Sequence, residues 1–317
     1  MHIDIIFQQI LILSILIFIG IAGAKLEVIS AAGKDSLAKL IFNITLPLML
    51  LTNFSRISIT PRLLTNSLHI LLLTFLALAF MLLISWFISK AFRMPRGEAS
   101  IFKTHCVFGN IVYLGFPLIA ALYGEEGLLY AGMFQLVTNM MIWTIGVVIL
   151  NQGKNLSILQ NVRHILNPNS FAVVIGFVMF LFSVKLPHVL LQSFGGLGDS
   201  TAYLSMVYIG AMMYYSSLKG FLNRREVYIF TLSKLFILPV MLIFVLSKAI
   251  DFIPGGLDRI VIGVLVLLVA MPGMANVVIM AKIFGADDKL ATANVAVSTV
   301  VSLISLPIVL LMIELLV

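Results

Sequence analysis

Residues 108–117 read FGNIVYLGFP and lie in the middle of an apolar segment long enough to cross a membrane. Residues 270–276, AMPGMAN, place proline, glycine and asparagine inside a second such segment. Proline removes a backbone donor and clashes with the preceding helical turn, and glycine tolerates an unwound backbone. In hydrocarbon, the backbone groups freed by a break must bond to protein, water or a ligand. The two stretches therefore predict two interrupted membrane helices.

The composition around these stretches is that of an all-α transmembrane protein. Of the 317 residues, 61% are hydrophobic and only 10% are charged, whereas a soluble domain carries about 25% charged residues. Apolar runs recur along the whole chain, and several reach the roughly 20 residues that cross a bilayer. The first ten residues lack the basic start of a cleavable signal, so we expect none. The single cysteine, Cys106, excludes an internal disulfide and a cysteine-rich metal site, and we expect no metal and no cofactor.

Charged residues and Gly/Pro positions divide the apolar sequence into ten predicted spans. These are 5–24, 36–55, 67–90, 98–123, 127–150, 170–187, 199–218, 226–248, 258–284 and 289–316. The loops after the odd-numbered spans hold twelve Lys and Arg residues, against five on the other side. The positive-inside rule then places those loops in the cytoplasm and both termini outside. Because the basic residues lie in these loops, the net charge of +7 does not indicate nucleic-acid binding.

Matches between polar and glycine positions indicate an internal repeat. Asp35-Ser36 and Asp199-Ser200 each open a predicted span, and residues 124–126 match residues 285–288 before the last span of each half. The spacing is about 160 residues throughout. Five spans is an odd number, so the halves must have opposite orientations, and inverted repeats of this kind are typical of transporters. We therefore expect five-helix repeats at 1–150 and 170–317, joined by a cytoplasmic linker at 151–169.

The two interruptions have a chemical consequence. A half-helix that begins near Pro117 or Pro272 presents unpaired N–H groups and a positive dipole end. Two such ends meeting inside the bilayer suit a carboxylate without burying a full formal charge, although prolines can also simply kink membrane helices. The candidate binding residues at the breaks are Asn110, Gly115, Pro117, Pro272 and Asn276.

Other polar residues fall inside predicted spans. Gln135 and Asn139 lie one helical turn apart, and Asn43 lies in the second span; they line a polar cavity or form interhelical hydrogen bonds. No Asp or Glu falls in the middle of a span, and because coupled carriers usually bury such a carboxylate, a proton- or sodium-driven carrier is disfavoured. Lys103 either attracts an anion or extends to the interface. Lys234 and His105 are the other intramembrane basic residues.

Residues 109–117, followed by Ala121-Leu122-Tyr123-Gly124, resemble the auxin efflux carrier family, which includes plant auxin exporters and bacterial malonate-type permeases. Asn167-Pro168 and the C-terminal segments around Pro272 and Leu306-Pro307 also look like that family. The resemblance implies ten helices in two inverted repeats, with the fourth and ninth crossing at their breaks. It further implies a carboxylate near that crossing, elevator-type alternating access and a homodimer. Asn110, Pro117, Pro272 and Asn276 are the positions carried over.

The stretch between the halves is short here, whereas the plant carriers have a long hydrophilic loop. The resemblance therefore favours a bacterial-type member in the inner membrane, with periplasmic termini. We expect a secondary transporter whose partners are the bilayer and a small carboxylate, such as a dicarboxylate or an auxin-like acid. A sodium-coupled symporter of the bile-acid type and a membrane receptor that does not transport are the alternatives. An enzyme is disfavoured, since no Asp-rich motif, His cluster or G-x-S-x-G sequence is present.

Overall fold

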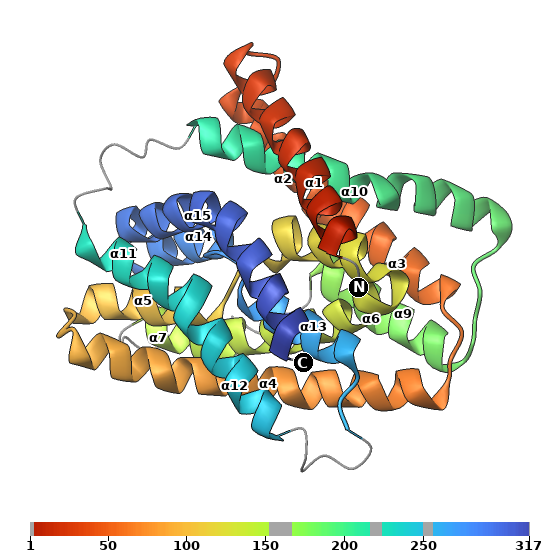
Figure 1. The fold of residues 1–317 in the computed structure, drawn as a ribbon. Helices are drawn as coiled ribbons and strands as arrows, with labels where there is room; N and C mark the ends of the chain where they lie inside the picture. The colour runs from red at the N-terminus through yellow and green to blue at the C-terminus, as the bar shows by residue number, and fades with distance from the viewer. Residues whose placement is uncertain (1–2, 152–166, 216–223, 250–255, 317) are drawn as a thin grey trace. The chain divides into compact units, whose positions relative to one another are not determined.

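The computed structural model describes residues 3–151, 167–215, 224–249 and 256–316, and within these ranges all regular structure is helical (Figure 1). The π-helical segments are η1 (Ile41–Thr45), η2 (Ile111–Gly115), η3 (Ile142–Gly146) and η4 (Ser233–Ile237). The α-helices are α1 (Ile3–Lys25), α2 (Ala31–Leu40), α3 (Leu46–Arg56), α4 (Pro61–Ala91), α5 (Arg96–Val107), α6 (Phe116–Met141), α7 (Val147–Asn151), α9 (Pro168–Leu181), α10 (His188–Tyr215), α11 (Arg225–Leu232), α12 (Leu238–Ala249), α13 (Arg259–Val269), α14 (Ala275–Phe284) and α15 (Asp288–Leu316).

Each predicted span overlaps one helix or a run of helices. Within the described ranges, five runs are long and apolar enough to cross a membrane: Ala31–Arg56, Pro61–Ala91, Ile111–Asn151, Arg225–Lys248 and Asp288–Leu315. Shorter apolar helices are Leu11–Lys25, Pro168–Leu181, Arg259–Val269 and Ala275–Phe284. Residues 152–166, which make up most of the predicted linker, lie outside the described residues.

Three of the π-helical segments end two residues before a proline: η1 before Pro47, η2 before Pro117 and η4 before Pro239. The wider π turn keeps the helix continuous, as η1 illustrates, because the Leu46 N–H bonds to the Ile41 carbonyl. The next carbonyl, on Phe42, faces a proline without an N–H and instead accepts a hydrogen bond from Asn169 Nδ2 at 3.1 Å. These prolines therefore sit inside continuous helices.

The predicted start of the seventh span differs most from the observed helix. The seventh span was expected to begin at residue 199, but α10 begins at His188 and runs through Gly195, Gly196 and Gly198. In α10 the absence of a Cβ serves close packing, because a Cβ on Gly198 would lie 2.7 Å from Met49 Cα on α3. The run Ile111–Asn151 is interrupted at Gly124, whose φ of 58° and ψ of −144° are not helical, and this interruption falls in the predicted gap between the fourth and fifth spans.

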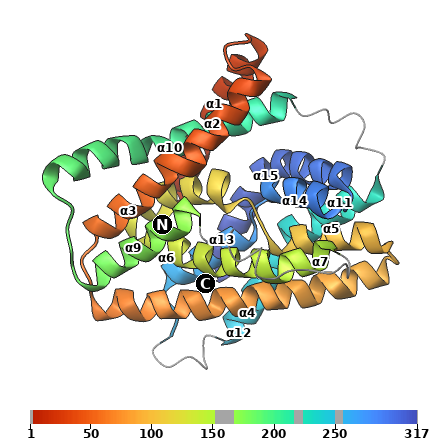
Figure 2. The ribbon, with the colours of Figure 1, turned by 180° about the vertical axis from the view of Figure 1, so that it is seen from behind.

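The chain divides into two compact units that each draw on both halves of the sequence. The first comprises Met1–Leu71, Val112–Leu136 and Leu166–Ser216, and the second comprises Leu72–Ile111, Val137–Ile165 and Ser217–Val317. Helices α1, α2, α3, α9 and α10 belong to the first unit, and helices α5, α7 and α11 to α15 belong to the second. The long helix α4 contributes residues to both (Figure 2).

In the first unit, α1 crosses α10 with the two backbones in direct contact (Figures 1 and 2). A Cβ added to Gly20 would overlap the Val207 carbonyl, and one added to Gly210 would overlap the Ile17 carbonyl. Small residues at a membrane helix interface permit this close approach, which maximises van der Waals contact where no hydrophobic effect is available.

Candidate functional site

The second unit contains both predicted interruptions. Helix α5 ends at Val107, Phe108 is extended with a φ of −104° and a ψ of 115°, and helical structure resumes at Ile111. Helix α13 ends at Val269, and α14 begins at Ala275. The first break thus lies before η2, so the expectation of a half-helix that begins near Pro117 is wrong. The physical reason is the π turn, which lets Pro117 sit in the second position of α6 without ending the helix.

The two broken segments pair with each other. Gly109 and Gly273 form an isolated antiparallel bridge, and the Asn110 N–H donates to the Pro272 carbonyl at 2.8 Å. A Cβ on Gly109 would lie 2.9 Å from the Cβ of Met271 and 3.0 Å from its carbonyl oxygen. Because real Cβ atoms do not approach that closely, the pairing requires glycine at this position.

Three side chains, from α15, η4 and α5 itself, bond to further backbone groups at the breaks. Ser298 Oγ on α15 accepts the Gly273 N–H at 3.0 Å, and His105 Nε2 lies 3.3 Å from the Met274 carbonyl. Lys234 Nζ donates to the Cys106 carbonyl at 2.9 Å. Backbone groups that helix breaks expose are thus bonded within the protein, as a membrane interior requires.

The amino end of α14 differs from this pattern. Its N-cap residue, Met274, provides no side-chain cap, and the first amides of any helix lack a helical acceptor. Asn276, half-buried in the first turn, adds a side-chain amide beside them. The positive end of a helix dipole next to a neutral amide is suited to an anion.

Residues 5–310 match the model of a protein family described as "Membrane transport protein". The chain belongs to this family, the auxin efflux carrier family. It is also 22% identical over 303 residues to an uncharacterized transporter of Methanocaldococcus jannaschii, with 93% of this chain and 94% of that protein covered. The chain is therefore a multi-pass membrane transporter, and its family comprises transporters rather than enzymes.

The positions carried over from the auxin efflux carrier resemblance lie in different parts of the chain. Asn110, Pro272 and Asn276 belong to the second unit, where Asn110 is 2% exposed and bonds directly to Pro272. Pro117 belongs to the first unit and is buried, as is Gly115 at the end of η2.

The other predicted residues differ in their surroundings. Gln135 in the first unit and Asn139 in the second are both buried. Asn43 is exposed, and its Nδ2 donates to the Lys39 carbonyl of its own helical run at 2.9 Å. That bond satisfies the Asn43 amide within its own helical run.

Sequence reasoning missed Asn294, whose Nδ2 lies 3.4 Å from His105 Nδ1. In this arrangement a neutral imidazole with its proton on Nε2 donates to Met274 and accepts from Asn294. The available signal was the spacing, since Asn294 precedes Ser298 by four residues and so shares its helix face. Within the described residues, no group of three His, Cys, Asp or Glu side chains could hold a metal ion.

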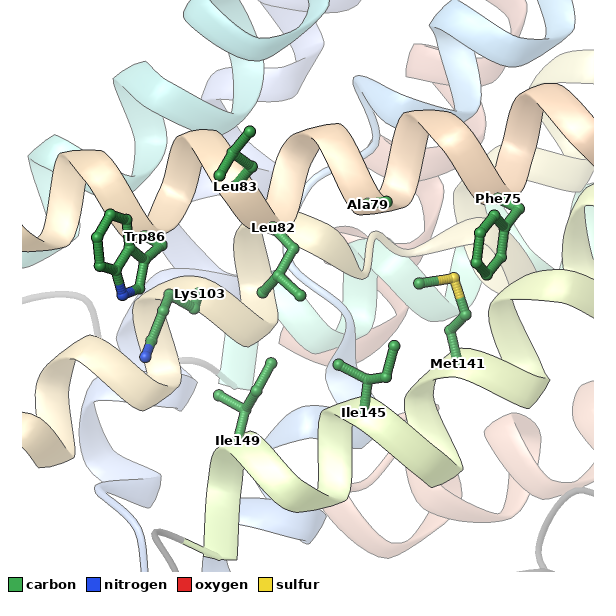
Figure 3. Close-up of a pocket in the computed structure, with 9 residues that line it drawn as sticks. All are labelled: Phe75, Ala79, Leu82, Leu83, Trp86, Lys103, Met141, Ile145 and Ile149. Atoms are coloured by element: carbon green, nitrogen blue, oxygen red, sulfur yellow. The ribbon is translucent and has the colours of Figure 1, made fainter.

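A groove of about 610 Å³ lies between α4, α5 and the segment from the end of α6 through η3 to α7, and all of its lining residues belong to the second unit (Figure 3). Its lining is apolar apart from Lys103. Figure 3 shows Lys103 and Trp86 at one end of the groove and Phe75 and Met141 at the other. Near the first end, Lys90 Nζ lies 5.0 Å from the centre of the Trp86 ring.

At the start of α11, Arg224 joins the first turn of α5 to the connection between α14 and α15, all in the second unit. It lies 2.9 Å from Asp287 and 3.4 Å from Glu98. The hydrogen bond to Asp287 raises the pKa of Arg224 above its ordinary value. Partial burial alone would raise the pKa of Asp287, but the hydrogen bonds from Arg224 and from the amides of Leu290 and Lys289 outweigh it and hold that pKa below its usual range.

Proposed function

We propose that this transporter is a secondary carrier for a small organic carboxylate, such as a dicarboxylate or an auxin-like acid. The carboxylate binds at the paired breaks, next to the uncapped amino end of α14 and the amides of Asn110 and Asn276. The observation that carries the proposal is the Asn110–Pro272 hydrogen bond, because it joins the two breaks into one polar locus inside an apolar unit.

The charge of this locus supports an anionic substrate. The side chains that bond to the two breaks are those of His105, Lys234 and Ser298, and none of them is acidic. Helix dipoles and neutral amides attract a carboxylate, whereas a cation carrier would need buried acidic ligands.

The ten-helix inverted repeat and elevator-type alternating access are also part of the proposal. The antiparallel direction of the paired breaks supports inverted halves at 1–150 and 170–317, with the cytoplasmic linker and periplasmic termini expected from the basic loops. The two compact units support a carrier with a scaffold part and a moving part. A homodimer in the inner membrane completes this description.

The test is uptake by proteoliposomes of labelled malonate, malate and phenylacetate, representing dicarboxylates and aromatic acids. We expect saturable uptake of at least one acid, reduced at least about tenfold by Asn276→Ala, since that is the loss when roughly 1.4 kcal/mol of binding is removed. The matched control is Gln192→Ala, an exposed amide on α10, which should leave uptake unchanged.

Two results would replace this proposal with an alternative. Uptake that disappears when potassium replaces sodium would identify a sodium-coupled symporter. Thermal stabilisation by an acid without any flux would identify a receptor. Uptake that survives both Asn276→Ala and Asn110→Ala would mean that the paired breaks are not the binding site.

A further inference from the structure

Lys234 is a lysine with no exposed surface inside an apolar helical run. It lies in η4, in the middle of the run from α11 to α12, and its exposed fraction is 0%. Among the described residues, its one hydrogen-bond partner is the Cys106 carbonyl, 2.9 Å from Nζ, and no carboxylate forms an ion pair with it. Lysine is almost never fully buried without a partner that compensates its charge.

The compensating group is the carboxyl end of the half-helix α5. Cys106 is the residue before Val107, where α5 ends. The last carbonyls of a helix lack helical partners and carry the negative end of its dipole. This end is held inside the apolar unit because Gly109 and Asn110 pair with the α13–α14 break instead of continuing the helix.

In the described part of the chain, the two titratable groups that interact with Lys234, His105 and Cys106, supply no negative charge. His105 precedes Cys106, and its two ring nitrogens are engaged by the Met274 carbonyl and the Asn294 amide. Cys106 itself is a buried free thiol. The helix end is thus the feature that offsets the ammonium.

In carriers with broken helices, the unwound carbonyls and carboxyl ends of half-helices coordinate the coupling cation. We propose that the Lys234 ammonium is a built-in cation at such a position, so that this carrier needs no mobile sodium ion to stabilise the broken helix. Only the conclusion that transport is not coupled to sodium rests on the proposed function. The stabilisation of the broken helix by Lys234 can be tested without any substrate.

The test is the melting temperature of the purified protein in detergent. Lys234→Met keeps the volume and removes the charge, and Lys234→Ala removes Cγ to Nζ, the atoms of n-propylammonium. We expect both variants to melt several degrees lower, since about 1 kcal/mol shifts the melting temperature of a domain by roughly 2–4 °C. n-Propylammonium chloride should restore Lys234→Ala but not Lys234→Met, and n-propanol should restore neither.

The matched control is Lys185→Met. Lys185 also donates to helix-terminal carbonyls, those of Arg56 and Ile57, but it is exposed, so its loss should cost less and should not respond to n-propylammonium. A Lys234→Met variant as stable as the wild type would overturn the proposal, and so would equal rescue of Lys234→Ala by n-propanol. If neither variant can be purified, the wild-type protein provides the test. A melting temperature or an uptake that depends on sodium would also refute the proposal.

The groove in Figure 3 carries a second, independent inference. Its lining is a row of apolar side chains that ends at a cationic group, Lys103, with Lys90 over the nearby Trp86 ring. Basic pockets between membrane helices bind anionic lipid headgroups, and tryptophan is enriched near the membrane interface. We propose that the groove binds an anionic phospholipid, with the acyl chain along α4 and the phosphate at Lys103.

This proposal is tested by native mass spectrometry of the delipidated protein with phosphatidylglycerol and phosphatidylcholine. We expect phosphatidylglycerol to bind at least about fivefold more tightly, and Lys103→Met to abolish that preference. Lys282→Met, which removes an exposed lysine of α14 outside the groove, is the control and should retain it. Equal binding of the two lipids, or an unchanged preference in Lys103→Met, would refute the proposal.

Discussion

Gly124 and Gly285, 161 residues apart, both adopt a positive φ, of 58° and 71°. Each is followed two residues later by an acidic side chain, Glu126 or Asp287, that pairs with an arginine at or just before the start of a helix. The two halves of the sequence therefore place a glycine of positive φ and an acid–arginine pair at corresponding positions in separate units, although ψ is −144° at Gly124 and 29° at Gly285. This correspondence supports the proposed repeat beyond the residue matches, because it includes the sign of φ and the ion pair.

The backbone at Gly124 leads to a first prediction. A Cβ there would meet no atom within 4 Å, so Gly124→Ala changes only the backbone strain. We expect a loss of about 1–3 kcal/mol of stability, because the conformation favours glycine alone. Gly196→Ala, in the helical part of α10 with equally open surroundings, should instead be neutral or stabilising. Melting temperatures of the two variants measure the difference, and equal values would show that Gly124 is not strained.

The Arg224–Asp287 pair predicts a pH dependence. Since the pKa of Asp287 is lowered in the folded protein, the pair contributes stability above the unfolded value of about 3.9. That stability is lost as the pH falls through the folded value. Asp287→Asn should cost about 0.5–1 kcal/mol at pH 7, a modest amount because the pair is partly exposed.

Melting curves from pH 7 to pH 3 check this expectation. The wild type should lose its advantage over Asp287→Asn as the pH falls below about 4. The control is Asp199→Asn, because Asp199 pairs with Arg56 at a more exposed position and should cost less. An advantage of the wild type that persists at pH 3 would contradict the assignment.

Contact between Gly109 and Met271 makes the paired breaks sensitive to one methyl group. Gly109→Ala should force the two segments apart, at a cost of about 1–3 kcal/mol, and should reduce uptake of the transported acid. Met271→Ala would not relieve the clash, because the Met271 carbonyl is also close. Melting temperature and uptake are measured together, and a Gly109→Ala protein with normal values of both would argue against a functional role of the pairing.

Ser298 leads to a fourth prediction, on helix α15. Ser298→Ala leaves the buried Gly273 N–H without its acceptor, which should cost about 1–3 kcal/mol. Ser302→Ala is the matched control, since Ser302 is equally buried and, among the residues that the structure describes, bonds to the Thr299 carbonyl of its own helix alone. A smaller effect of Ser298→Ala than of Ser302→Ala would contradict the role given to Ser298.

Much of the helical arrangement could be predicted from sequence because apolar runs and their breaks are local signals. The exact position of the first break could not be predicted, because Pro117 and Pro272 look alike in sequence. A π turn precedes Pro117 and keeps the helix continuous there, whereas the chain around Pro272 is not helical. The start of α10 was missed because Gly195 and Gly198 serve packing against α3, a contact that only the folded chain reveals.

The surroundings of the site were less predictable than the breaks themselves. Lys234 was recognisable as an intramembrane lysine, but its partner, Cys106, is 128 residues away. His105 and Asn294 are likewise joined only in space. Single-sequence reasoning identifies polar residues in apolar helices and cannot determine which of them meet.

The π turns before Pro47, Pro117 and Pro239 have a consequence for how the family can diverge. Each of these turns accommodates one residue more than a regular turn, and in a regular helix one residue corresponds to a rotation of about 100°. A lineage that loses such a proline can delete one neighbouring residue and still present the same helix faces to the rest of the bundle. Single-residue gaps in alignments of related chains should therefore fall at these three places. Each such gap would indicate a local change from a π turn to an α turn, with the fold unchanged.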